Sequence, residues 1–177
     1  MVRATPQERA QFSAQAAADW ERILLARAAE LAPGGRFICL NFGIDKKGRY
    51  LGHTGGHSMF DNFTRHWRAM RDEGRITKQE FIRATFAQHY RTVEEFTAPF
   101  DDPSSPVRQA GLKLISVETR LTPCPYNALY REASTKMSSA DYAASLIPTT
   151  RSWSETVFRT ALASRPEAEI RALLDAF

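Results

Sequence analysis

The fold class of this chain is indicated by residues 30–40, which read Glu30-Leu31-Ala32-Pro33-Gly34-Gly35-Arg36-Phe37-Ile38-Cys39-Leu40. A long helical pattern ends at the Pro-Gly-Gly step, and a short, continuously apolar run follows at once. A helix, a tight turn and a buried strand in this order form the unit from which α/β sheets are built. We therefore expect an α/β chain with a strand over residues 37–42, covered on both faces and parallel to its neighbour.

Helix signals surround this stretch. Thr5-Pro6-Gln7-Glu8 is a capping box with proline at the first helical position, and apolar residues recur at helical spacing from there to Leu31. Further capping boxes begin at Thr77 and Thr92. Additional helices are expected over about 59–73, 140–146, 152–163 and 166–177, with a glycine-rich loop over 43–58.

Only one further segment reads as a strand, the β-branched run over residues 112–121. Two strands do not make a stable sheet unless something covers or extends them. The helices bury them unusually, a partner chain completes the sheet, or the sequence is a piece of a longer protein. The residues alone leave these three alternatives open.

Composition excludes several classes of protein. The chain has 177 residues, of which 43% are hydrophobic and 25% charged, so it is expected to fold rather than to be disordered. The net charge of +4 is mild, which argues against a nucleic-acid partner. No apolar stretch is long enough to cross a membrane, and two distant cysteines suggest no disulfide framework. We expect a cytoplasmic protein with Cys39 as a small core residue.

Five short motifs occur in one order along residues 11–165. They are Gln15–Trp20 followed by Leu24–Leu31, Pro33–Phe37, Met70–Ile76, Tyr90–Glu95 and Arg151–Glu155. Together they resemble the SABATH family of S-adenosylmethionine (SAM)-dependent carboxyl methyltransferases, which methylate salicylate, benzoate, jasmonate and related acids.

The resemblance implies a C-terminal part of a Rossmann-like class I methyltransferase sheet with a helical cap, helix-rich and with few strands. Residues 1–177 would then be one partial domain, with sheet-and-helix core elements in 1–58 and 111–177 and the cap in 59–110. It implies SAM as cofactor and a small carboxylic acid as substrate. The glycine-rich cofactor loop of the family and its ribose-holding acidic residue are absent from this chain, so tight SAM binding by the chain itself is not expected.

Methyl transfer to a carboxylate is an in-line displacement that needs no general base, because the acid is already ionised at neutral pH. No catalytic side chain is therefore expected, and the site should consist of pocket walls. By resemblance, the substrate-binding residues are Met59, Phe60, Tyr90 and Thr150. The expected rim residues are Asn41, Phe42 and Arg151, the first two because ligands bind at the carboxyl ends of strands in open α/β sheets.

Plainer interpretations compete with each of these assignments. Met59 and Phe60 share a helical spacing with Phe63 and Trp67, which is also the pattern of an ordinary core. Tyr90 could cap a surface, and Arg151 could form a salt bridge. The whole chain could also be a truncated, non-catalytic module for binding or oligomerisation, such as a homodimer.

A metal site is not expected. His53 and His57 are four residues apart with Asp45 and Asp61 nearby, but they lie in a glycine-rich loop that fixes no ligand geometry. The segment Gly52–Gly56 lacks the lysine of a phosphate-binding loop.

Overall fold

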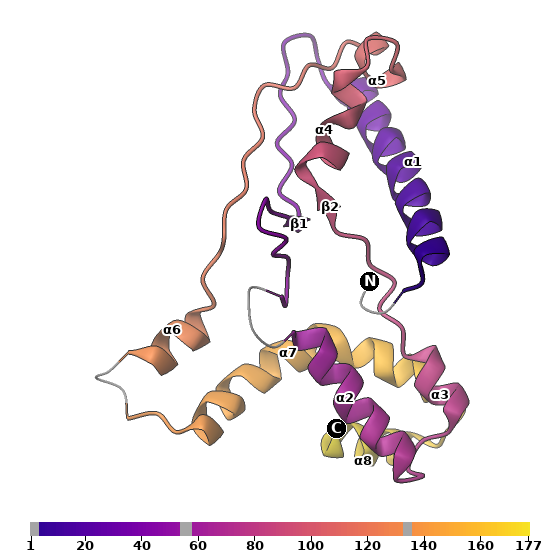
Figure 1. Cartoon of the computed structure of the whole chain (residues 1–177), viewed down its shortest axis with the longest axis vertical. Coiled ribbons are helices and arrows are strands. Elements are labelled where there is room, and N and C mark those ends of the chain that lie inside the picture. The colour runs from indigo at the N-terminus through magenta and orange to yellow at the C-terminus, as the bar shows by residue number, and fades with distance from the viewer. Residues whose placement is uncertain (1–3, 54–57, 133–135) are drawn as a thin grey trace. The chain divides into compact units, whose positions relative to one another are not determined.

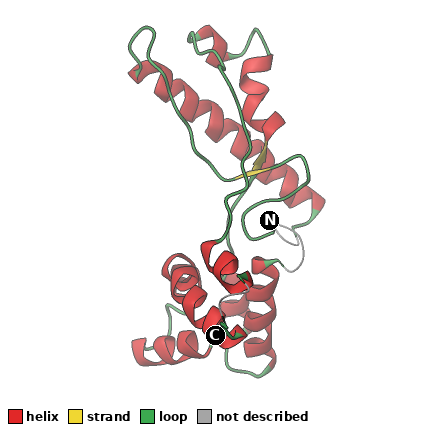
Figure 2. Cartoon of the chain, turned by 90° about the vertical axis from the view of Figure 1, so that its left-hand side faces the viewer, coloured by secondary structure: helices red, strands yellow, loops and turns green. Residues whose placement is uncertain are grey.

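The computed structural model describes residues 4–53, 58–132 and 136–177, and these are predominantly helical. The helices are α1 (Pro6–Glu30), α2 (Met59–Asp72), α3 (Lys78–Arg83), α4 (Val93–Asp101), α5 (Pro106–Gln109), α6 (Pro125–Arg131), α7 (Ser139–Ala161) and α8 (Glu167–Ala176). Two short strands, β1 (Gly43–Ile44) and β2 (Arg91–Thr92), complete the described elements (Figures 1 and 2). The helix-rich α/β class with few strands agrees with this arrangement.

The chain divides into two compact units. Unit 1 comprises Met1–Asn62 and Ala87–Thr119, and unit 2 comprises Phe63–Phe86 and Arg120–Phe177. The predicted methyltransferase domain with a cap over 59–110 stays a prediction. No helix in the described part of the chain is long and apolar enough to cross a membrane.

Unit 1 is built around α1, α4 and α5. Trp20, Leu24 and Val107 form its buried core. The Trp20 ring meets Phe96 edge-on at 5.3 Å, and its indole N–H donates to the Phe96 carbonyl at 3.0 Å. A buried indole with a satisfied N–H adds specific geometry to apolar burial, so this contact fixes α1 against α4.

The strand pair of unit 1 is parallel, with Gly43 opposite Arg91 and Ile44 opposite Thr92. Gly43 sits tightly here, since an added Cβ would lie 3.2 Å from the Arg91 carbonyl oxygen. The parallel direction agrees with the prediction. The strand itself lies at Gly43–Ile44 rather than at residues 37–42.

Residues 37–42 are not a strand. They are irregular and lead into β1, and Leu40 and Ile38 are 94% and 82% exposed. The second predicted strand, 112–121, is irregular as well, with Ile115 76% exposed. Figure 1 draws both stretches as extended traces without strand arrows. A strand that is apolar on both faces needs neighbours on its edges, and the described residues supply pairing only at Gly43–Ile44.

The same correction applies to Cys39, which is exposed rather than a core residue, because its segment is not buried in a sheet. Cys124 is exposed too.

Unit 2 has an aromatic-rich core. Its buried residues are Trp67, Met70, Ile76, Phe158, Ala161, Leu162, Ile170, Leu173 and Leu174. Trp67 and Phe158 lie 5.0 Å apart between ring centres, and Phe158 lies 4.4 Å from Phe177. These contacts hold α2, α7 and the C-terminal residue together in one cluster.

Helix α7 also differs from expectation. The sequence predicts two helices, over about 140–146 and 152–163, separated near Pro148. The structure has one helix, Ser139–Ala161, with Pro148 inside it. A proline removes one main-chain hydrogen bond from a helix interior, and here the residues on both sides remain helical.

Candidate functional site

A tight turn in unit 1 connects three of the predicted substrate residues. Tyr50 and His53 form an antiparallel bridge, in which the Tyr50 N–H donates to the His53 carbonyl at 3.1 Å and the His53 N–H donates back at 2.9 Å. Gly52 within this turn has φ +78°, in the left-handed region that glycine adopts without strain. The two backbone hydrogen bonds and the left-handed glycine therefore fix the conformation of this turn.

Met59 and Phe60 pack directly against this turn. The Met59 N–H donates to the Gly52 carbonyl at 2.8 Å, so the first residue of α2 is tied to the turn backbone. A Cβ added to Gly52 would lie 2.8 Å from Met59 Cε and 3.4 Å from Phe60 Cε2. A larger residue at position 52 would force Met59 to shift and would strain the backbone at this positive φ. Phe60 is buried, and Met59 is half-buried.

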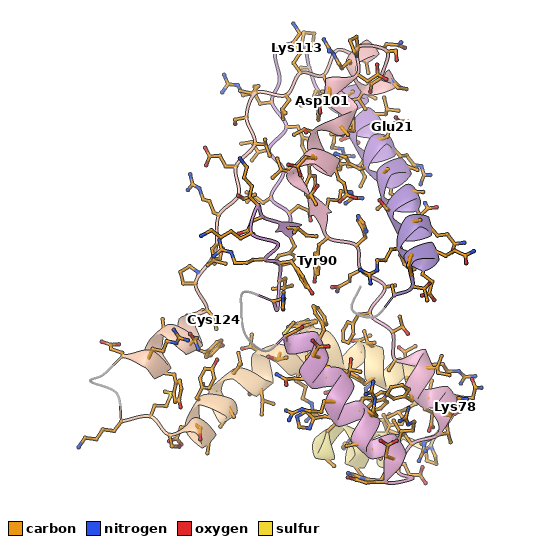
Figure 3. The ribbon with its side chains drawn as sticks, in the orientation of Figure 1. Glu21, Lys78, Tyr90, Asp101, Lys113 and Cys124 are labelled. Carbon is orange, nitrogen blue, oxygen red and sulfur yellow. The ribbon has the colours of Figure 1, made fainter. Side chains whose placement is uncertain are left out.

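Tyr90, the residue directly before β2, contacts the same turn (Figure 3). Its ring stacks on Tyr50 at 5.5 Å, and Tyr50 in turn lies 5.1 Å from the His53 ring. The Tyr90 hydroxyl donates to Gln88 Oε1 at 2.5 Å. Burial raises the pKa of Tyr90, and the neighbouring Tyr50 adds to this rise, so Tyr90 is a neutral aromatic surface at physiological pH.

The structure thus places Met59, Phe60 and Tyr90 around one turn. Gly52 and Tyr50 make these contacts, and the His53 ring lies against Tyr50. The sequence motifs assign none of these three residues to the site. An aromatic residue, a glycine and a histidine within four residues are the available signal, but a glycine-rich segment predicts only a loop. The His53 Nδ1 atom is buried and has no hydrogen-bond partner among the described residues.

Asn41 and Phe42 are exposed residues of the irregular segment before β1. They do not end a long strand, as the rim assignment supposed. They do immediately precede the Gly43–Ile44 pairing, so they remain close in sequence to the edge of the parallel pair.

Thr150 and Arg151 belong to α7 in unit 2. The Thr150 hydroxyl donates to the Leu146 carbonyl of its own helix at 3.2 Å. Arg151 hydrogen-bonds to Glu155 and lies 2.8 Å from the Asp175 carboxylate. These two carboxylates raise the pKa of the Arg151 guanidinium, Glu155 contributing most. These contacts agree with the interpretation of Arg151 as a salt-bridge residue.

No cluster of three or more potential metal ligands occurs in residues 4–53, 58–132 and 136–177. His57 lies outside the described residues. Asp45 holds its own turn together, because its carboxylate accepts from the Lys47 and Arg49 N–H groups at 2.9 Å each and from Arg49 Nε at 2.7 Å. Hydrogen bonding to Arg49 lowers the pKa of Asp45.

The described residues do not fit SAM. A nucleotide-type cofactor in an α/β fold needs a glycine-rich turn after a strand and an acidic side chain for the ribose hydroxyls. Asp45 is the acidic residue that follows β1, and Arg49 with the turn amides already uses its oxygens. Comparison with known proteins finds no family model, no curated protein and no solved structure that matches this chain.

Proposed function

We propose that this chain supplies the acid-binding part of a SAM-dependent methyltransferase that esterifies the carboxylate of a small organic acid. One observation carries the proposal. The turn Tyr50–His53 contacts Met59, Phe60 and Tyr90, and these are three of the four residues that the resemblance to the SABATH family assigns to the acid. The type of reaction is proposed from the ordered sequence motifs. The turn is the proposed binding site of the acid.

The side chains around the turn suit an aromatic or unsaturated acid. In the proposal the flat ring of the acid stacks on the Tyr50 and Tyr90 side chains. The Met59 thioether is a polarisable group that adapts to irregular ligand shapes. Such a surface orients a ring and excludes water from it, which is the main requirement when the nucleophile is a carboxylate that is ionised without help.

His53 provides a polar group beside this apolar surface. Its Nδ1 atom has no partner among the described residues, and an imidazole N–H is a suitable donor to a carboxylate oxygen. In the proposal His53 binds one carboxylate oxygen and fixes its direction. Thr150 and Arg151 have no role in this step, since both are engaged within unit 2.

The proposal is tested by titrating the full chain, labelled with ¹⁵N, with salicylate, benzoate and cyclohexanecarboxylate. We expect aromatic acids to shift the amide signals of Tyr50, Gly52 and Met59, with a dissociation constant of about 0.1–1 mM, as suits a ligand of this size. The saturated acid should bind more weakly because it cannot stack. No shift at these amides with any of the acids would overturn the proposal.

Matched variants separate the site from general effects. Tyr90→Leu should weaken binding of salicylate about fivefold, since stacking of this kind is worth about 1 kcal/mol. Tyr130 is the control, because it stacks on Tyr142 at 4.7 Å in unit 2, and Tyr130→Leu should leave the affinity unchanged. Gly52→Ala should abolish the shifts, whereas Gly48→Ala, which also has positive φ but nothing within 4 Å of an added Cβ, should retain them.

A further inference from the structure

The carboxylate of Glu95 connects three parts of unit 1. Glu95 is the third residue of α4 and closes the capping box of this helix, since its Oε2 atom accepts from the Thr92 N–H at 2.9 Å. Its Oε1 atom accepts from the Ser13 hydroxyl of α1 at 3.1 Å and lies 3.1 Å from His89 Nε2. In the capping box of α7, by contrast, the described residues bond to the Asp141 carboxylate only within the box. The second oxygen of Glu95 therefore has a task beyond capping.

The ionised state of Glu95 assigns the direction of its bond to His89. Burial alone would raise the pKa of Glu95. The hydrogen bonds from Thr92 and Ser13, together with the adjacent His89, nevertheless hold this pKa below its ordinary value. An ionised carboxylate can only accept hydrogen bonds, so the imidazole donates through its Nε2–H group. The His89 side chain thus ties the main chain before β2 to α4, and both side chains of this pair are half-buried.

Tyr90 lies between two residues that are anchored to the helices of unit 1. His89 bonds to α4, and the Arg91 guanidinium donates through Nη2 to the Ala16 carbonyl of α1 at 2.5 Å. Tyr90 itself stacks on Tyr50 instead. These contacts follow the alternation of an extended chain, in which successive side chains point in opposite directions. The anchoring of its two neighbours therefore sets the position of Tyr90.

We propose that His89 is a positioning residue for the acid site. Its bond to Glu95 holds Tyr90 in the orientation in which the tyrosine ring stacks on Tyr50. A hydrogen bond to an ionised carboxylate is charge-assisted and stronger than a neutral one. Ser13 extends this link to α1, a helix of the buried core of unit 1. The effect on acid binding rests on the proposed function, whereas the effect on the two rings does not.

The first test compares His89→Gln with His89→Asn in the full chain, without any ligand. The amide nitrogen of glutamine reaches the place of the imidazole Nε2 atom, whereas that of asparagine reaches only the place of Nδ1. Only glutamine can therefore keep the bond to Glu95. We expect the nuclear Overhauser effect between the Tyr50 and Tyr90 rings to persist in His89→Gln and to disappear in His89→Asn. His66→Asn, at an exposed position of α2, is the control and should leave this signal unchanged.

The second test is a double-mutant cycle on the binding of salicylate. His89→Asn should weaken binding about fivefold, as expected for Tyr90→Leu. In the Tyr90→Leu background, His89→Asn should cause at most about a twofold further loss, because a residue that acts through Tyr90 then has nothing left to position. A residue that merely stabilises unit 1 would instead cause the same loss in both backgrounds.

The two tests separate the role of His89 from the proposed function. Equal ring contacts in His89→Gln and His89→Asn would overturn the proposal, as would the absence of this contact in the unsubstituted chain. Equal losses of salicylate affinity in both backgrounds of the cycle would also overturn it. If salicylate does not bind the unsubstituted chain, the proposed function is wrong, and the ring contacts of the two variants still decide the role of His89.

Discussion

At the residue scale, Glu80 is the clearest case of a side chain whose charge the fold has stabilised. It is buried, yet its carboxylate accepts from Arg165 Nε at 2.6 Å and Nη2 at 2.8 Å, and from the Thr77 N–H at 2.7 Å. A buried charge persists only when it is paired and hydrogen-bonded. Chiefly through Arg165, the pKa of Glu80 falls from 4.5 to about 2.

This lowered pKa makes the stability of unit 2 dependent on pH. Because the folded state holds the ionised form, the contribution of Glu80 is fully present above about pH 4.5 and is lost as the pH falls toward 2. The shift corresponds to about 3 kcal/mol. We expect Glu80→Gln to lower the free energy of unfolding by about 2–3 kcal/mol at pH 7 and by much less at pH 2, as measured by denaturant titration.

Glu73 provides the matched control for this prediction. Its carboxylate lies 3.8 Å from Arg75 and its side chain is 60% exposed, so Glu73→Gln should change stability by less than about 0.5 kcal/mol. An equal loss for Glu80→Gln at pH 7 and pH 2 would show that the ion pair is not its cause.

At the scale of elements, helix ends follow local chemistry closely. Thr5, Thr77 and Thr92 each accept a hydrogen bond from the N–H three residues on, and the glutamate there accepts in return. All three capping boxes predicted from the sequence are confirmed. A capping box needs only four neighbouring residues, which is why it is readable without knowledge of the tertiary fold.

Helix α7 does not follow its local sequence signals, since its interior contains Pro148, a residue that usually ends or kinks a helix. We expect Pro148→Ala to stabilise the chain by about 2 kcal/mol. The substitution restores one main-chain hydrogen bond and removes the clash of the proline ring, although the more flexible unfolded chain offsets part of this gain. Thermal unfolding followed by circular dichroism measures the effect.

Pro6 is the control, because it occupies the first turn of α1, where its missing N–H has no helical partner. Pro6→Ala should be close to neutral. If both substitutions have the same effect, the position of the proline within the helix is not what matters.

At the scale of the whole molecule, the chain should not bind SAM tightly. The only sheet of the described residues is the two-stranded pair β1–β2, and the acidic residue after β1 is engaged by Arg49. Calorimetric titration of the full chain with SAM and S-adenosylhomocysteine should give no micromolar binding. Salicylate in parallel should bind as proposed above, so a micromolar response to SAM would contradict the prediction while leaving acid binding intact.

The sequence by itself determined the elements whose stability is local. The bounds of α1 and α2 and the starts of α3 and α4 were predicted to within a few residues, since capping residues and apolar periodicity act within one or two turns. It also brought Met59, Phe60 and Tyr90 into one hypothesis, although through resemblance rather than through any contact visible in the chain.

Only the tertiary structure decided what residues 37–42 and 112–121 do. Their composition favours strands, but a strand is stable only when another backbone pairs with it and other side chains cover it. The described residues provide such pairing at Gly43–Ile44 alone, so the two runs stay irregular and exposed. Likewise, the stacking of Tyr50 on Tyr90 joins residues 40 positions apart, and no local pattern encodes a contact of that kind.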